Sequence, residues 1–376
     1  MAKRKIAFII TKLQLGGAQK SVLYSVENLP KNKEDKFETY LLCGPGGFLD
    51  EKAKKEVKNL FFIPNLQRKI NLKKDFLAFK EIRTVLKKIK PDIVHTNSSK
   101  AGLIGRFAAA SLGIKCVHTV HGFAFNSEQK LPVKMFYILL ETFCSLMTKK
   151  VIFVANTDME LAKKYHITSD KKIVLIRAGV EVKTRQDFPL FNKEKKLKEL
   201  NLTKENKIVL SIANLKPQKN PLDMIRIAKI VCNKFPKTVF LYLGTGPLKE
   251  DSEKLIKEYH LENNFKLLGH RTDTSELLLI SDVFALSSLW EGLPMALVEA
   301  LFMQVPAVCY NVNGIKEVLQ NGKNGFLIPP KNKQKAAQSI IKILEGSFKF
   351  TSLDLTDFDI NTMVKNQAAL YESLLK

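Results

Sequence analysis

Two glutamates carry the clearest chemical signal in the sequence. Glu291 and Glu299 enclose Gly292-Leu293-Pro294-Met295-Ala296, and they follow an apolar run that is typical of a strand. Pro294 suits the first turn of a helix, whose free backbone amides could bind phosphate or sugar oxygens. Glu299 falls among apolar residues, where a carboxylate needs a hydrogen-bonding partner such as the vicinal hydroxyls of a ribose. The alternative is a pair of ordinary surface glutamates.

A lysine lies at a similar point in the chain. Another strand pattern is followed by the segment Asn214-Leu215-Lys216-Pro217-Gln218-Lys219-Asn220-Pro221. A helix begins after this segment, and Asn220 could cap it. Lys219 could neutralise a diphosphate that gains negative charge as a bond breaks. A solvated lysine in a polar turn is the alternative.

Two glycines follow the first strand pattern. Gly16 and Gly17 would allow a ligand to approach closely, and the helix that begins there offers backbone amides to a phosphate. The segment is not the dinucleotide fingerprint GxGxxG, and no acidic residue follows at a suitable position. A plain tight turn explains the pair equally well.

His121 ends another strand pattern and is followed by Gly122 and Phe123. There it could hydrogen-bond a sugar hydroxyl or act on an acceptor, or it could be a packed structural histidine. His95, in the strand before Asn97-Ser98-Ser99-Lys100, leaves the same two alternatives open. The remaining histidines show no metal-ligand spacing, and the one Asp-x-Asp pattern, Asp357-Phe358-Asp359, is interpreted as a helix cap, so no metal site is expected.

The elements that must position these residues alternate between strand and helix patterns, which predicts parallel sheets covered by helices. Strands are expected at residues 6–11, 38–42, 60–63, 93–96, 116–120, 151–154 and 173–176, and then at 208–213, 239–243, 265–268, 283–286, 307–310 and 325–328. Amphipathic helices are expected at 72–89 and 360–375. We therefore predict two α/β domains, residues 1–186 and 187–356, and a C-terminal helix at 357–376 that packs back towards the first domain. Ligands of such domains bind beyond the carboxyl ends of the strands, and the cleft between the domains is the expected site.

The composition is that of a globular protein with an excess of positive charge. The 376 residues contain 61 Lys and Arg against 37 Asp and Glu, a net charge of +24. Residues 1–188 contribute +18 of this, from 35 basic and 17 acidic residues. An anionic partner of the first half is expected, either a nucleic acid, a phosphate-bearing molecule or a membrane surface. A lysine-rich proteome is the alternative explanation.

Two further classes are excluded by the sequence. No apolar run reaches the roughly 20 residues of a membrane-spanning helix, and the run at 6–10 is too short for a signal peptide. The five cysteines form no CxxC pair, which predicts neither a disulfide framework nor a zinc site.

With these residues in place, the chain resembles the family 4 retaining glycosyltransferases of the GT-B fold, which has two Rossmann-like domains. The resemblance runs nearly end to end. It is carried by Gly16-Gly17, the segment from Ser99 to Arg106, His121-Gly122-Phe123, Lys219, Gly244-Thr245-Gly246-Pro247-Leu248 and the Glu291/Glu299 pair. It implies retaining transfer of a hexose or N-acetylhexosamine from a UDP-sugar, with no cofactor and no essential metal.

The family's roles are carried over by resemblance alone. Glu299 would bind the donor ribose, Glu291 the donor sugar and Lys219 the diphosphate, while His121 would lie near the reacting centre; His121, Lys219 and Glu291 form the expected catalytic set. The full donor-binding set is Gly16, Gly17, Asn214, Lys219, Gly269, His270, Arg271, Glu291, Gly292, Leu293, Pro294, Met295, Ala296 and Glu299. The acceptor-binding set is Asn97, Ser98, Lys100, His121 and Phe123.

One position departs from the family pattern. Asn214 stands where the family often has an arginine beside the diphosphate, so that charge would come from Lys219 alone or from Lys216 or Arg271. Three alternatives stay open: a UDP-sugar epimerase of the same fold, a basic nucleic-acid binder without catalysis, and a glycosyltransferase-like regulator that has lost activity.

The acceptor is expected to be a lipid-linked saccharide, because residues 98–125 are similar to enzymes that build surface glycans on polyprenyl diphosphate carriers. Lysines line the helix at 72–89 and flank the aromatic stretch at 136–143, a pattern that suits an anionic interface. We therefore expect a cytoplasmic enzyme, peripheral on the inner leaflet of the cell membrane, that binds no nucleic acid.

Overall fold

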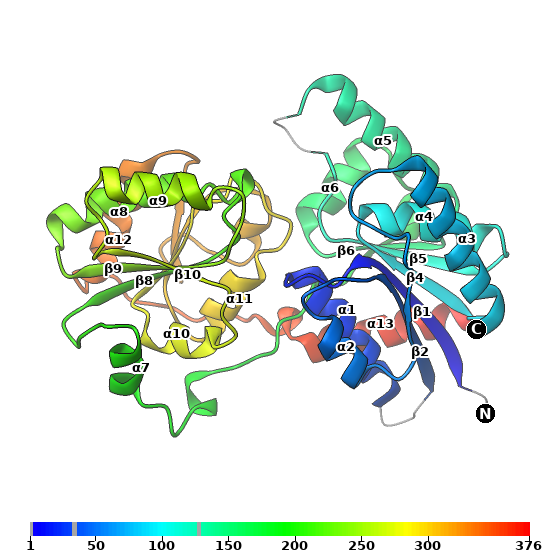
Figure 1. The fold of residues 1–376 in the computed structure, drawn as a ribbon, viewed down its shortest axis with the longest axis horizontal. Helices are drawn as coiled ribbons and strands as arrows, with labels where there is room; N and C mark the ends of the chain where they lie inside the picture. The colour runs from blue at the N-terminus through cyan, green and yellow to red at the C-terminus, as the bar shows by residue number, and fades with distance from the viewer. Residues whose placement is uncertain (1–2, 32–35, 126–128) are drawn as a thin grey trace. The chain divides into compact units, whose positions relative to one another are not determined.

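The chain folds into two compact units (Figure 1), described by a computed structural model for residues 3–31, 36–125 and 129–376. Unit 1 comprises Met1–Val180 and Thr356–Lys376, and unit 2 comprises Glu181–Leu355. The first change of unit therefore falls a few residues before the expected boundary at 186. The C-terminal helix, expected to pack back towards the first domain, is part of unit 1.

Each unit is built on one parallel sheet. In unit 1 the strand order is β3-β2-β1-β4-β5-β6-β7. Its strands are β1 (Arg4–Lys12), β2 (Phe37–Gly44), β3 (Leu60–Phe62), β4 (Ile93–Asn97), β5 (Lys115–Val120), β6 (Lys150–Phe153) and β7 (Ile173–Leu175). In unit 2 the order is β10-β9-β8-β11-β12-β13, again with every pair parallel. Its strands are β8 (Lys207–Ile212), β9 (Thr238–Leu243), β10 (Phe265–Gly269), β11 (Val283–Leu286), β12 (Ala307–Tyr310) and β13 (Gly325–Ile328).

Helices connect the strands and cover both faces of each sheet (Figure 1). Those of unit 1 are α1 (Gly17–Asn28), α2 (Asp50–Glu56), α3 (Leu72–Ile89), α4 (Ser99–Ala110), α5 (Leu131–Leu146), α6 (Asn156–Lys164) and α13 (Ile360–Leu375). Those of unit 2 are α7 (Lys193–Glu199), α8 (Pro221–Lys234), α9 (Lys249–Glu258), α10 (Thr274–Ile280), α11 (Met295–Phe302) and α12 (Lys333–Leu344). Short 3₁₀ helices lie at Leu29–Lys31, Asp170–Lys172, Arg185–Asp187, Pro217–Lys219, Asn313–Glu317 and Thr356–Phe358.

The core of unit 1 follows from the alternation of side chains along a strand. Ile6, Phe8 and Ile10 of β1 pack with α1, α2 and α13, whereas Ala7 and Ile9 face the opposite way and pack with α3 and α4. Because helices cover both faces, all five residues are fully buried. This two-sided burial explains why β1 is a continuous apolar run in the sequence.

Helix α13 completes the core of unit 1. Asp359 accepts a hydrogen bond from the backbone N–H of Asn361 and so caps the helix, as the sequence predicted. Met363 and Tyr371 are buried against β1, and the Tyr371 hydroxyl lies 2.6 Å from Nδ1 of His95 in β4. Burial of each such large side chain stabilises the fold by roughly 1.5–3 kcal/mol. The helix is therefore an integral part of the first domain.

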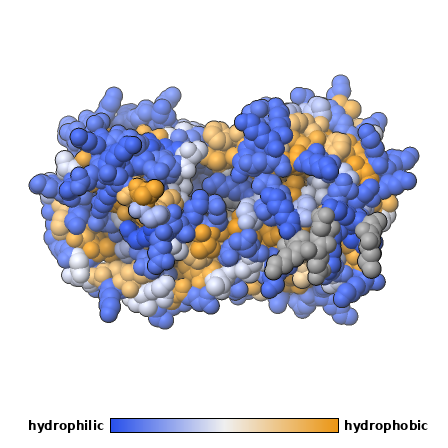
Figure 2. Space-filling model, turned by 90° about the horizontal axis from the view of Figure 1, so that it is seen from below, coloured by the Kyte–Doolittle hydropathy of each residue, from blue (hydrophilic) through white to orange (hydrophobic). Residues whose placement is uncertain are grey.

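The surface seen in Figure 2 is mostly hydrophilic, with hydrophobic side chains in scattered patches. Among the described residues, no helix is both long enough and apolar enough to span a bilayer. All five cysteines are free thiols and are buried.

Candidate functional site

Lys219 and Glu291 meet at the carboxyl edge of the unit 2 sheet. Lys219 lies in the loop after β8 and Glu291 in the loop after β11; because these strands are parallel neighbours, the two loops lie side by side. The Lys219 ammonium donates to Oε1 of Glu291. The Glu291 side chain is 6% exposed and that of Lys219 is 18% exposed. The pair therefore places a nearly buried carboxylate beside an ammonium that water still reaches.

The two loops are also joined through their backbones. Leu289 N–H donates to the Gln218 carbonyl at 2.8 Å, and the Gln218 amide returns a hydrogen bond to the Trp290 carbonyl at 2.8 Å. The Ser287 hydroxyl donates to the Asn220 carbonyl at 2.8 Å. These bonds fix the loops to each other, so the ion pair has a defined position.

The prediction that Asn220 caps α8 is wrong. Asn220 has a left-handed backbone, with φ of 50°, and its side chain makes no capping hydrogen bond. Its amide instead donates to Asp223 at 2.8 Å, and Asp223 also accepts from the Tyr310 hydroxyl at 3.1 Å. Pro221 opens the helix, and its fixed φ suits that position.

The segment Gly292–Ala296 leads into α11, which begins at Met295 with Pro294 as its N-cap residue. The amides of Met295 and Ala296 belong to the first turn, where no acceptor exists within a helix. Glu299 lies one turn further along and is partly buried. A Cβ atom at Gly314 would collide with the Gly292 carbonyl, so the loop after β12 packs directly on this segment.

Two glycine turns bring the loops after β9 and β10 to the same edge. Gly244, with φ of 137°, packs so closely on the Ala213 carbonyl that a side chain would collide with it. Gly244 N–H donates to the carbonyl of Gly269 at 2.8 Å, and Thr245 Oγ1 lies 2.9 Å from His270 Nε2. The exposed Asn214 directly follows Ala213, the residue on which Gly244 packs. The expected nucleotide residues Asn214, Gly269 and His270 therefore belong to one connected set of loops.

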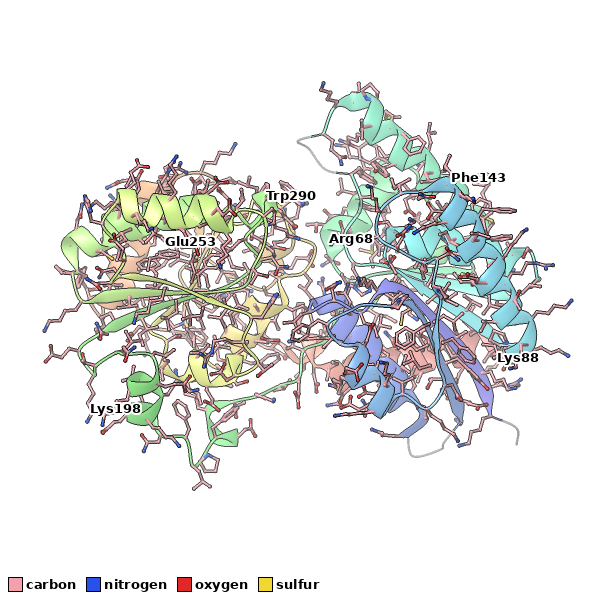
Figure 3. The ribbon with its side chains drawn as sticks, viewed as in Figure 1. Arg68, Lys88, Phe143, Lys198, Glu253 and Trp290 are labelled. Atoms are coloured by element: carbon pink, nitrogen blue, oxygen red, sulfur yellow. The ribbon has the colours of Figure 1, made fainter. Side chains whose placement is uncertain are left out.

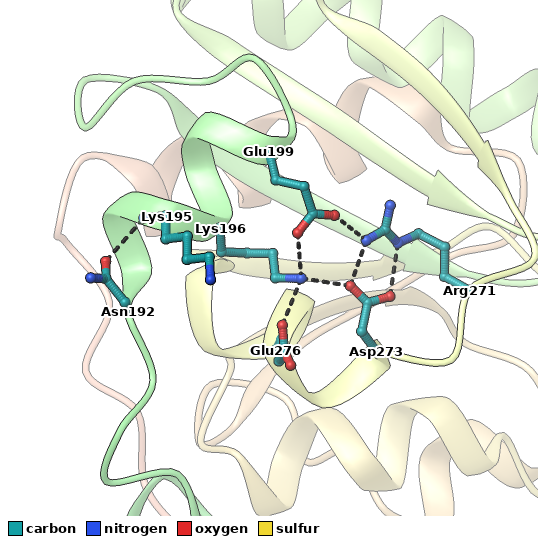
Figure 4. Close-up of polar contacts among 7 residues, drawn as sticks. All are labelled: Asn192, Lys195, Lys196, Glu199, Arg271, Asp273 and Glu276. Carbon is teal, nitrogen blue, oxygen red and sulfur yellow. Dashed lines mark hydrogen bonds and ion pairs between the residues drawn. The ribbon is translucent and has the colours of Figure 1, made fainter.

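Arg271 belongs to a network of ion pairs (Figure 4). Its guanidinium binds both carboxylate oxygens of Asp273, at 2.8 and 2.5 Å, and Oε1 of Glu199 in α7 at 2.5 Å. Lys196, also in α7, donates to Glu199 and Asp273 at 2.8 Å and pairs with Glu276 at 2.6 Å. The loop after β10 is thereby tied to α7.

The network shifts the protonation of its members. The hydrogen bond from Arg271 holds the pKa of Asp273 well below its usual range. Burial alone would lower the pKa of Lys196, but hydrogen bonds from its ammonium to Asp273, Glu199 and Glu276 raise it. Asp273 and Lys196 are therefore charged near neutral pH, and the Arg271 charge is balanced by the carboxylates of Asp273 and Glu199.

A second set of predicted residues lies at the carboxyl edge of the unit 1 sheet. The loops after β1, β4 and β5 are neighbours there and carry Gly16 and Gly17, Asn97 and Ser98, and His121. His121 Nε2 lies 3.0 Å from Oδ1 of Asn97, and burial lowers the pKa of His121 to about 4. The imidazole is therefore neutral near pH 7, which suits a hydrogen-bonding role.

The glycines and Ser98 shape this edge. Gly16 is the extended N-cap residue of α1 and Gly17 its first residue. Ser98 has φ of 66°, and its hydroxyl lies 2.7 Å from that of Thr11, which in turn accepts from Ala101 N–H at 3.2 Å. The start of α4 is thereby bound to the end of β1.

Two of the predicted acceptor residues make contacts inside unit 1. The Lys100 ammonium lies 2.5 Å from Oδ1 of Asp75 and donates to the Lys69 carbonyl at 2.5 Å, and its side chain is 14% exposed. Phe123 stacks on Phe125 with ring centroids 4.6 Å apart. Both residues therefore have structural contacts of their own.

His95 is a packed structural histidine, one of the two alternatives that the sequence left open. Its ring nitrogens lie 2.6 Å from the Tyr371 hydroxyl and 2.7 Å from the Thr119 hydroxyl, and burial lowers its pKa to about 3. Among the described residues, no group of three or more His, Cys, Asp or Glu could hold a metal ion.

Comparison with solved structures identifies the fold. The structure resembles Anabaena HepE in complex with UDP-glucose, with a TM-score of 0.81 at 19% identity over 98% of this chain and 99% of that one. It also resembles sucrose-phosphate synthase from Thermosynechococcus elongatus, with a TM-score of 0.81 at 17% identity over 99% of both chains. The expected GT-B fold is thus confirmed.

Sequence comparisons give the family. Residues 15–184 match the model of Glycosyltransferase Family 4, and residues 192–353 match that of Glycosyl transferases group 1. The chain is 37% identical over 352 residues to the UDP-Gal:alpha-D-GlcNAc-diphosphoundecaprenol alpha-1,3-galactosyltransferase of Escherichia coli, covering 92% of this chain and 89% of the relative. It is 26% identical over 327 residues to the O-antigen biosynthesis glycosyltransferase WbnH of Escherichia coli, covering 86% of each. The chain belongs to glycosyltransferase family 4 and is a glycosyltransferase.

Proposed function

We propose that this enzyme transfers a hexose or N-acetylhexosamine from a UDP-sugar to a saccharide carried on a polyprenyl diphosphate lipid, with retention of anomeric configuration. The similarity to the Escherichia coli galactosyltransferase over most of both chains carries the proposal, since that relative's name specifies UDP-galactose and a GlcNAc-diphosphoundecaprenol acceptor. UDP-galactose and that acceptor are therefore the first substrates to test.

The Lys219 and Glu291 pair supports a division of roles in the donor site. Lys219 is the partly exposed member of the pair. Its ammonium can therefore bind a diphosphate without a movement of the loop that carries it. Glu291, held in place by that ammonium, would accept hydrogen bonds from donor sugar hydroxyls, and Glu299 would bind the ribose. Gly269, His270 and Arg271 would lie beside the base.

The proposed reaction breaks the bond between the sugar's anomeric carbon and the diphosphate oxygen and forms one to the oxygen of an acceptor hydroxyl, whose proton passes to the departing diphosphate. The electron pair leaves with UDP, where Lys219 and the first-turn amides of α11 stabilise the growing charge. The neutral His121 would hydrogen-bond the sugar near the reacting carbon, with Gly16 and Gly17 near the phosphates. We assign no general base, no resident cofactor and no metal.

The enzyme would act at the inner leaflet of the cell membrane, where the basic unit 1 meets anionic lipid. Unit 1 has 35 basic and 18 acidic residues, a net charge of +17, which supports this location because clustered lysines are attracted to anionic lipid headgroups. Asn97, Ser98, Lys100 and Phe123 would lie along the path of the acceptor, with the internal contacts of Lys100 and Phe123 shaping it.

The test is a transfer assay with EDTA present. The purified enzyme is incubated with UDP-galactose, UDP-glucose, UDP-GlcNAc or UDP-GalNAc and with GlcNAc-diphosphoundecaprenol, and both UDP release and product mass are measured. The expected result is UDP release with one donor, a matching gain in mass and an α linkage in the product. Lys219→Met should lower the rate of transfer about 10²–10³-fold, whereas Lys254→Met, at an exposed residue of α9, should leave it unchanged.

Other outcomes would contradict the proposal. Epimerised UDP-sugar without transfer would show an epimerase, and salt-sensitive RNA binding without turnover would show a nucleic-acid binder. A β product would refute retention, and loss of activity in EDTA would refute metal independence.

A further inference from the structure

Helix α5 presents an apolar face where a surface helix normally presents polar residues. Its exposed side chains include Met135, Phe136, Leu139, Phe143 and Leu146, which are 42–73% exposed. They are three or four residues apart, apart from the adjacent first two, so they form one stripe along the helix. We call these five residues the α5 stripe. An ordinary amphipathic helix buries such a stripe.

The α5 stripe continues onto a neighbouring helix. The rings of Phe107 in α4 and Phe143 lie 5.9 Å apart, and both are exposed. Figure 3 shows Phe143 on the outer side of unit 1, away from its sheet. Contiguous exposed apolar patches on soluble domains mark contact with a partner or a membrane.

The charges around the α5 stripe favour an anionic partner. Glu141, the one acidic residue of α5, is 13% exposed and pairs at 2.9 Å with the buried Arg106. The outer face of the helix therefore presents no negative charge. Lys130 and Lys149 are exposed just beyond the two ends of the helix, and the Lys134 ammonium lies over the Tyr165 ring at 5.0 Å.

We propose that α5 lies in the plane of an anionic bilayer, with the α5 stripe among the acyl chains and the flanking lysines on the headgroups. A helix of 16 residues is about 24 Å long, which suits an interfacial position. A second copy of this chain fits less well, because pairing two such faces would bring like-charged lysines together. The inference rests on the proposed function, since a lipid-linked acceptor requires the enzyme to reach the membrane surface.

Helix α3 provides a matched comparison within unit 1. Leu72 and Phe76 are 84% and 57% exposed, but the remaining outer positions of α3 are largely lysines. We therefore expect α3 to contribute attraction to headgroups without providing the apolar anchor. We therefore expect the same kind of substitution to weaken membrane binding more in α5 than in α3.

The test is sedimentation of the full-length protein with vesicles of phosphatidylcholine alone or with 30% phosphatidylglycerol. We expect binding to the anionic vesicles that weakens with salt and falls at least tenfold in Leu139→Gln/Phe143→Gln. The matched pair Leu72→Gln/Phe76→Gln should lose less than threefold. Circular dichroism and thermal unfolding should show that both variants are folded.

Several results would overturn the inference: no loss in the α5 variant, an equal loss in the α3 variant, equal binding to neutral vesicles, or a wild-type dimer that the α5 variant converts to a monomer. Vesicle binding needs no substrate, so this test is independent of the proposed reaction. If the proposed acceptor is wrong, the wild type and the α5 variant both fail to transfer sugar to it, while the wild type still binds anionic vesicles and the α5 variant still binds them more weakly. If only the α5 assignment is wrong, the variant transfers sugar to a vesicle-embedded acceptor as fast as the wild type does.

Discussion

Removing the ammonium of Lys219 should cost both stability and catalysis, and the two losses can be separated. In Lys219→Met the Glu291 carboxylate, 6% exposed, loses its ion-pair partner. Breaking a buried pair from one side costs about 3–5 kcal/mol. Because water reaches Lys219, we expect the lower end, about 3 kcal/mol. In a domain of this size that lowers the melting temperature of unit 2 by roughly 6–12 °C.

The double variant Lys219→Met/Glu291→Gln removes both charges. Its unit 2 should recover to within about 1 kcal/mol of the wild type, because no unpaired charge remains buried. Transfer should not recover, because the developing charge on the diphosphate has lost its ammonium. We expect a decrease in kcat of about 10²–10³ in both variants, the usual effect of removing one stabilising donor.

The measurements are thermal unfolding by circular dichroism and UDP release at saturating donor. Lys254→Met controls for the loss of a lysine at the surface. If activity returned together with stability in the double variant, Lys219 would serve only to neutralise Glu291, and its assignment to the diphosphate would be wrong.

Four further results are expected. Asp273→Asn removes the carboxylate that Lys196 and Arg271 share, so the donor KM should rise while kcat changes less. An unchanged KM in a donor titration would show that the network does not fix the position of the loop proposed to lie beside the base. Burial holds the pKa of His95 at about 3, against 6.5 for an unfolded chain, so the unfolded state binds more protons as the pH falls below 6.5. Urea unfolding should show unit 1 losing about 3 kcal/mol from this group between pH 6.5 and 4, and His95→Gln should reduce that dependence. The pKa of about 4 for His121 predicts that kcat between pH 6 and 8 contains no inflection from this residue, so an inflection near 6.5 that disappears in His121→Asn would contradict the hydrogen-bonding role. Glu299→Gln should weaken UDP binding about tenfold in calorimetry if the carboxylate binds the ribose, and leave it unchanged if it does not.

The sheets and the long helices could be predicted because their signals are local. The predicted ranges of α3 and α13 agree with the structure, since each helix has an amphipathic pattern and a side chain that caps it, Asn71 and Asp359. The strands of both sheets are also where the apolar runs placed them, because strands covered on two faces need continuous apolar sequence.

The contacts around the candidate site could not be predicted, because they join residues distant in the chain. Lys196 and Asp273 are separated by 77 positions, and each alone is an ordinary charged residue on a helix or loop. The ion pair between Lys100 and Asp75 could not be predicted for the same reason. The Asn220 cap was wrong because the capping rule considers only the helix, whereas Asp223 competes for the asparagine side chain.

The exposure of α5 illustrates a different limit. An aromatic and aliphatic run such as 136–143 is equally consistent with a buried helix and with a surface one, because a hydrophobic pattern does not reveal which face another element covers. The structure shows that Ile138 and Cys144 face the core while Phe136 and Phe143 do not.

The place of α13 in unit 1 has a consequence for the order of folding during synthesis. Domains of a growing chain commonly fold from the N-terminus onward. Here β1 and β4 are made early, but Tyr371 and Met363, which cover them, are made only after all of unit 2. Unit 2 can therefore complete its core first. Until α13 has been synthesised, Phe8 and His95 lack the helix that covers them. During that interval the uncovered apolar surface of β1 makes the nascent chain prone to aggregation.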